Sequence, residues 1–147
     1  MKRFVLLALV LAMSLGLMAC GSQTAPATES STASLTYKDV ASFIKSQLES
    51  QFKYTEITYD ETGMTIFLSL DNISTTCALA KYGNAEMAKS WNSIIDSTED
   101  LAESVTESFR SIGCKDYVVS IVIANESNFG DILAMFLNGE LVYNAAA

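Results

Sequence analysis

The sequence predicts an α+β fold, with one N-terminal helix and one long middle helix packed in two layers on an antiparallel sheet of about five strands. Apolar residues recur at helical spacing in residues 36–50 and 85–112, and five shorter stretches have the composition of strands. Turn-forming residues separate these stretches. We therefore expect the order α-β-β-α-β-β-β within a single domain, residues 36–147, which is long enough for one domain and too short for two.

The first half of this domain is expected to be a helix followed by a hairpin. Thr36 and Asp39 have the spacing of a capping box, in which each residue bonds the backbone of the other at a helix start. Residues 53–59 and 64–70 alternate between apolar and polar side chains, as strands do when one face is buried. Asp60-Glu61-Thr62-Gly63 between them supplies the turn.

The long middle helix is expected over residues 85–112 and ends at Gly113, a residue that commonly stops helices. Its apolar residues keep helical spacing throughout, with Trp91 among them. Within it, Ser97-Thr98-Glu99-Asp100 resembles a second capping box, so the alternative is two helices with a break at that point. We favour one helix.

The last part of the chain returns to strands. Residues 117–124 are strongly β-branched, 125–131 form a polar loop, and 132–137 are an uninterrupted apolar run. Asn138-Gly139 is the preferred pair for a type I′ turn, which leads into a short final strand at 140–143.

These C-terminal strands are apolar on both faces. Val119, Ile121 and Ile123 alternate with Val118 and Val122, and the same holds within 132–137. Two helices on one face would leave the other face partly exposed. Either the helices divide between the faces, which we favour, or the second face contacts a ligand or another protein.

The amino terminus has the three zones of an export signal. Lys2 and Arg3 precede an uncharged apolar stretch at residues 4–17, and the chain turns polar directly after Cys20. Leu17, Ala19 and Cys20 resemble the lipobox of bacterial lipoproteins, with Met18 departing from the small residue usual at that position. The resemblance covers the first 20 residues only. It implies removal of residues 1–19 and attachment of a diacylglyceryl group and acyl chains, such as palmitate, to Cys20.

Two alternatives to lipidation remain. Residues 4–20 would form an uncleaved transmembrane helix at the short limit of about 17–25 residues, or an ordinary signal peptide would release a soluble product. We favour the lipoprotein, which two or more acyl chains would hold stably on a membrane. Residues 20–35 would then be the lipidated cysteine and a disordered tether, since they are rich in Ser, Thr and Ala and lack apolar periodicity.

Cys77 and Cys114 are the other two cysteines. An exported compartment permits a disulfide between them. A continuous helix over 85–112 would be about 40 Å long and would hold them near opposite ends, beyond the limit of about 7 Å between bridged Cα atoms. A break at Ser97 would make the bridge feasible. We favour two buried, free cysteines.

Composition restricts the function. The chain has no histidine, which excludes His-ligated zinc and Ser-His-Asp or Cys-His catalysis. Removal of residues 1–19 would leave 7 basic and 17 acidic residues, a net charge of −10. Such a chain lacks the basic patches that bind nucleic acid or anionic lipid. Its charge favours calcium, cationic peptides or a basic protein. A twelve-residue EF-hand loop starting at Asn125 fails, however, because Phe129 and Phe136 stand at its fifth and twelfth positions, where ligands are needed.

From these observations we expect a membrane-anchored, extracytoplasmic, non-catalytic module that binds a protein or peptide and needs no cofactor or metal. It would be located on the outer face of the cytoplasmic membrane, or on the periplasmic side if the source has two membranes. The alternative is a lipoprotein that binds a small ligand or lipid in a cavity between helix and sheet. The third candidate is a hydrolase that uses two carboxylates about 5–10 Å apart.

Overall fold

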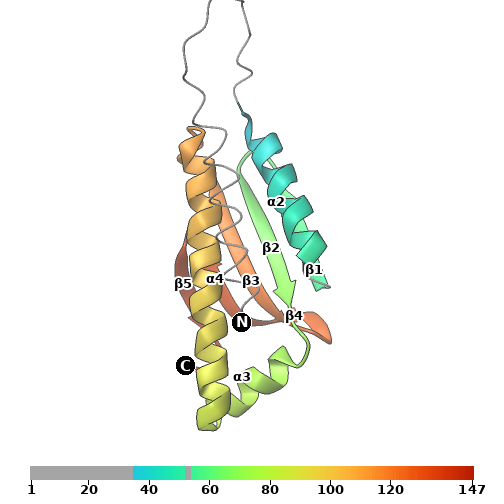
Figure 1. The fold of residues 1–147 in the computed structure, drawn as a ribbon, viewed down its shortest axis with the longest axis vertical. Coiled ribbons are helices and arrows are strands. Elements are labelled where there is room, and N and C mark those ends of the chain that lie inside the picture. Colours follow the sequence, from blue (N-terminus) through green and yellow to red (C-terminus); the bar gives the residue numbers. More distant parts are fainter. Residues whose placement is uncertain (1–34, 52–53) are drawn as a thin grey trace, which may run out of the picture.

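The structure, a computed structural model, describes residues 35–51 and 54–147, and Figure 1 shows their arrangement. The helices in this part of the chain are α2 (Tyr37–Gln51), α3 (Ile73–Lys81) and α4 (Ala85–Ser111). The strands are β1 (Tyr54–Tyr59), β2 (Gly63–Ser69), β3 (Val118–Asn125), β4 (Asn128–Leu137) and β5 (Glu140–Asn144). The α+β class and the expected order of strands and main helices are confirmed, with α3 as an addition.

The five strands form one sheet in the order β1-β2-β3-β4-β5. Three of the four pairings are antiparallel, as expected, but β2 and β3 are parallel. The all-antiparallel prediction was therefore wrong at this one pairing. The reason is the connection: α3 and α4 form a long crossover that returns the chain to the end of the sheet at which β2 begins, as parallel pairing requires.

The helices and one face of the sheet enclose a single hydrophobic core. Figure 1 shows α2 and α4 running across this face, with α3 at the end where α4 begins. The largest fully buried side chains come from both layers: Trp91, Phe109, Phe136, Ile44, Leu48, Met64, Ile66, Leu68, Ile73 and Leu101. Burial of large aromatic and branched side chains from every helix makes the core the main source of stability.

Helix α4 is continuous, as we favoured. At the second candidate cap, the Ser97 hydroxyl donates to the carbonyl of Ser93 (2.7 Å) and the Thr98 hydroxyl to that of Ile94 (2.8 Å). Both hydroxyls therefore bond backward along the helix, as Ser and Thr do in helix interiors. The actual cap is Asn84, whose side-chain oxygen accepts from the backbone N–H of Met87 (3.0 Å).

The capping box at the start of α2 is confirmed. The Asp39 carboxylate accepts from the Thr36 hydroxyl (2.7 Å) and backbone N–H (2.8 Å), and the Asp39 N–H donates to the Thr36 hydroxyl (3.4 Å). These bonds, the hydroxyl bond foremost, lower the pKa of Asp39 below its ordinary value. The box fixes where α2 begins.

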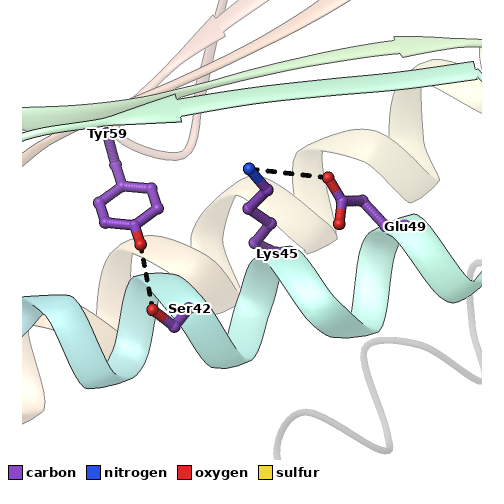
Figure 2. A network of polar contacts seen from close by, with 4 residues as sticks. All are labelled: Ser42, Lys45, Glu49 and Tyr59. Atoms are coloured by element: carbon purple, nitrogen blue, oxygen red, sulfur yellow. Dashed lines mark hydrogen bonds and ion pairs between the residues drawn. The ribbon is translucent and has the colours of Figure 1, made fainter.

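Figure 2 shows two polar contacts of α2, one with strand β1 and one within the helix. The hydroxyls of Ser42 and Tyr59 lie 3.0 Å apart and join α2 to the end of β1. Lys45 and Glu49 form an i,i+4 ion pair at 3.8 Å. An exposed pair of this kind contributes at most about 0.5 kcal/mol, so apolar packing holds α2 on the sheet.

The first turn of helix α3 is contacted by a residue from a turn that is distant in the sequence. Its N-cap residue, Asn72, makes no side-chain capping bond. Instead the Glu126 carboxylate, from the β3–β4 turn, accepts from the backbone N–H (3.0 Å) and hydroxyl (2.8 Å) of Ser74. Burial alone would raise the pKa of Glu126, but its hydrogen bonds outweigh burial and lower it. A carboxylate at a helix N-terminus is stabilising, so this contact ties α3 to the sheet.

The loop expected over residues 125–131 is shorter in the structure. Only Glu126 and Ser127 form the turn, and β4 already begins at Asn128. The side chain of Asn125 accepts from the Ser127 N–H (2.9 Å), as turn-forming asparagines do. The polar residues of this segment thus serve the hairpin.

Candidate functional site

Helices α2, α3 and α4 all pack against the same face of the sheet. The expectation that the helices divide between the two faces was therefore wrong. Side chains of the core and those of the second face alternate along each strand. We call the second face the open face; its members, taken from the strand register, are Glu56, Thr58, Thr65, Phe67, Val118, Ser120, Val122, Met135, Leu137, Glu140 and Tyr143.

The open face is apolar at its centre. Phe67, Val122, Met135 and Tyr143 form one row across β2, β3, β4 and β5. Val122, on the middle strand, is buried, whereas Phe67 and Met135 on either side of it are half-buried. Tyr143 is 48% exposed. The smaller side chains of β3 therefore lie along the middle of the face, between larger ones on β2 and β4.

Exposed large apolar side chains occur on and beside the open face, and also at the end of α3, where Tyr82 is 85% exposed. Among the residues that the structure describes, Val118 (44% exposed), Leu137 (39%) and Tyr143 (48%) belong to the open face. Ile132, which lies in the middle of β4 and pairs with Ala124, is 39% exposed. A cluster of exposed apolar residues is typical of an interaction surface, whereas single ones are common on any protein.

A shallow hollow of about 330 Å³ lies at the end of the open face next to the β1–β2 turn. Thr58, Thr65 and Ser120 form a row of hydroxyls in its lining, beside Val118 and Asp60. The Asp60 carboxylate accepts from the hydroxyl and N–H of Thr62 (2.6 and 2.7 Å). These bonds lower the pKa of Asp60, so the hollow has a fixed negative charge at its margin.

All charged residues on the five strands are acidic. The five strands contain Glu56, Asp131 and Glu140 but no Lys or Arg. Glu56 lies opposite Phe67 and Glu140 opposite Leu137, so the two edge strands each place a carboxylate on the open face, and both are exposed. The described basic residues all lie on the helices or in the α4–β3 loop: Lys38, Lys45, Lys81, Lys89, Arg110 and Lys115.

Cys77 and Cys114 are free in the structure, as we favoured. Cys77 lies on α3 and is buried, and Cys114 follows the C-terminal end of α4 and is half-buried. The continuous α4 lies between them in the chain. Burial raises the pKa of the Cys77 thiol, against a smaller opposing effect of Lys81, and a thiol held in its neutral form is a poor nucleophile.

Tyr117 is a buried polar group that the sequence did not single out. Its hydroxyl donates toward the carbonyls of Asp60 and Gly63, each at 2.9 Å, and its ring stacks on Phe109 with centroids 4.2 Å apart. Burial, with a smaller effect of Asp60, raises the pKa of Tyr117 to about 12. The hydroxyl therefore stays protonated and holds the β1–β2 turn against α4.

The predicted lipidation site, Cys20, lies outside the described residues, as do the signal segment 1–19, the alternative transmembrane segment 4–20 and nearly all of the tether. Within residues 35–51 and 54–147, no helix is long and apolar enough to cross a membrane, and no three His, Cys, Asp or Glu side chains are grouped to hold a metal ion. No protein-family model, curated protein or solved structure matches the chain.

Proposed function

We propose that this chain is a lipid-anchored, extracytoplasmic binding module that contacts a protein partner through the open face of its sheet. The observation that carries this proposal is the one-sided packing of the helices, which leaves Val118 (44% exposed), Leu137 (39%) and Tyr143 (48%) on the open face without a covering element among those described. Exposed apolar side chains that lie outside the core are typical of a surface that contacts a partner.

The interior of the domain supports a protein partner over a small ligand. A ligand or lipid would need a cavity between the helices and the sheet. Trp91, Phe109 and Phe136 occupy this layer, and each is at most 1% exposed. The hollow at the β1–β2 end lies on the open face, outside the core, so it is available to a side chain of a bound protein.

The amino-terminal sequence supports the anchor. We expect Cys20→Ala to move the protein from the membrane fraction to the soluble or secreted fraction, because the acyl chains are the main attachment of an acidic domain. Fractionation of cells followed by immunoblotting measures this, with Cys77→Ala as the matched control that should stay on the membrane. Unchanged retention of the Cys20→Ala protein would contradict lipidation.

Contact through the open face can be tested by cross-linking in the producing cell. A photo-reactive amino acid at Leu137, which is 39% exposed, is expected to give a discrete adduct of defined mass. The same amino acid at Glu107, exposed on α4, serves as the control and should give none. Equal adducts at both positions, or none at either, would count against a partner on the open face.

A further inference from the structure

We infer that the open face binds a basic amphipathic helix, whose apolar stripe packs against Val118, Leu137 and the half-buried Met135. The Lys or Arg side chains of this helix pair with Glu56 and Glu140. This inference rests on the proposed function and specifies the chemistry of its partner. It is argued from the width of the apolar band and from the charges at its margins.

The apolar band of the open face, which we define as its residues on β2, β3 and β4, has the width of one helix. Its three strands, β2, β3 and β4, span two interstrand spacings of about 4.8 Å, or roughly 10 Å, and an α-helix with its side chains is about 10–12 Å across. From Val118 to Val122 the band extends about 13 Å at 3.3 Å per residue. This length corresponds to two to three turns of a helix at about 5.4 Å per turn.

The carboxylates lie where a helix in this position would place its flanking residues. Glu56 is on β1 and Glu140 on β5, each one strand outside the band. Lys and Arg can lay their apolar stems along a hydrophobic surface and hold the charge at its margin. A third negative charge, Asp60, lies at the rim of the hollow and is kept ionised by its hydrogen bonds with Thr62.

The same charges disfavour the other occupants. A second copy of the chain would bring two open faces together, each with Glu56 and Glu140 and without a Lys or Arg on any strand to pair with them. Anionic lipid headgroups would be repelled for the same reason. An acidic margin around an apolar centre is complementary to a basic amphipathic segment, and complementary charge selects among partners more than it adds affinity.

Two synthetic helical peptides of about five turns test this inference. One has a stripe of Leu flanked by Lys, and the other has the same stripe flanked by Glu. The full chain is held in nanodiscs of phosphatidylcholine, which has no net charge, and binding is measured by surface plasmon resonance after subtraction of nanodiscs without the chain. We expect the Leu/Lys peptide to bind and the Leu/Glu peptide not to bind.

The charge variants separate this inference from the proposed function. Glu56→Gln/Glu140→Gln is expected to weaken the binding of the Leu/Lys peptide about tenfold, or about 1.4 kcal/mol, since two ion pairs at the margin of the face are lost. Glu86→Gln/Glu107→Gln removes the same charge from exposed positions of α4 and should change the affinity less than about twofold. The affinity of the unaltered chain should also fall as salt is raised from about 0.05 to 0.5 M.

Three outcomes would overturn the inference. Equal binding of both peptides, or no loss in the Glu56→Gln/Glu140→Gln variant, would exclude charge pairing at the rim. Binding of neither peptide, together with an adduct at Leu137, would reject the basic helix but keep the protein partner. Dimers in analytical ultracentrifugation that are lost in Leu137→Glu would identify a second copy as the occupant.

Discussion

Replacing Trp91 with alanine is expected to lower the free energy of unfolding by about 3–5 kcal/mol, the usual cost of removing a large aromatic side chain from a core. Trp91 is 1% exposed, and its indole N–H donates to the side-chain oxygen of Asn144 at 2.9 Å. The residue therefore joins the first half of α4 to the end of β5. Since domains of this size are stable by only about 5–15 kcal/mol, the loss removes a large part of the total.

The conservative variant Trp91→Phe separates packing from the hydrogen bond. It keeps most of the buried ring and loses the donor to Asn144, so we expect a smaller loss of about 1–2 kcal/mol. Urea unfolding followed by far-ultraviolet circular dichroism measures both variants, because Trp91 is the only tryptophan and its fluorescence is lost with it. A loss below about 1 kcal/mol in Trp91→Ala would contradict the role assigned to this residue.

Local signals in the sequence predicted the elements that local interactions build. The capping box of Thr36 and Asp39 is formed, and the Asn138-Gly139 turn has the positive φ angles (52° and 97°) that its type requires. The apolar residues at helical spacing, Trp91 among them, predicted the length of α4. In each of these cases the residues that determine the structure lie within about four positions of one another, so their spacing in the sequence predicts it.

Contacts between distant residues were not visible in the sequence. Helix α3 opens with Ile-Ser-Thr-Thr, residue types that favour helices only weakly. The carboxylate at its start comes from Glu126, which lies 52 residues beyond Ser74 in the chain. The open face was foreseen only as one of two alternatives. Apolar residues on both sides of β3 were evident, but only the strand register shows that Glu56 and Glu140 flank them.

Gly63→Ala is expected to destabilise the domain by about 1–3 kcal/mol or more, because there is no room for a methyl group at this position. A Cβ added to Gly63 would lie 2.6 Å from the carbonyl oxygen of Val118. That oxygen belongs to β3, and the β2–β3 pairing is the one that joins β1 and β2 to the other three strands. The carbonyl of Gly63 also accepts from the Tyr117 hydroxyl at 2.9 Å, so the backbone is held from both sides.

Gly130→Ala is the matched control for this substitution. Neither glycine has a positive φ, so alanine is compatible with the backbone at both positions. At Gly130 the nearest atom to an added Cβ is the side-chain oxygen of Asn128, at 3.2 Å. This oxygen accepts from the Gly130 N–H (3.1 Å), but the bond is exposed and water can replace it if the side chain moves. We therefore expect a loss of at most about 1 kcal/mol. Urea unfolding followed by Trp91 fluorescence compares the two variants. Equal stability of both would mean that the β2–β3 pairing adjusts to a methyl group, and that the two halves of the sheet are joined less rigidly than the close approach of Gly63 and Val118 indicates.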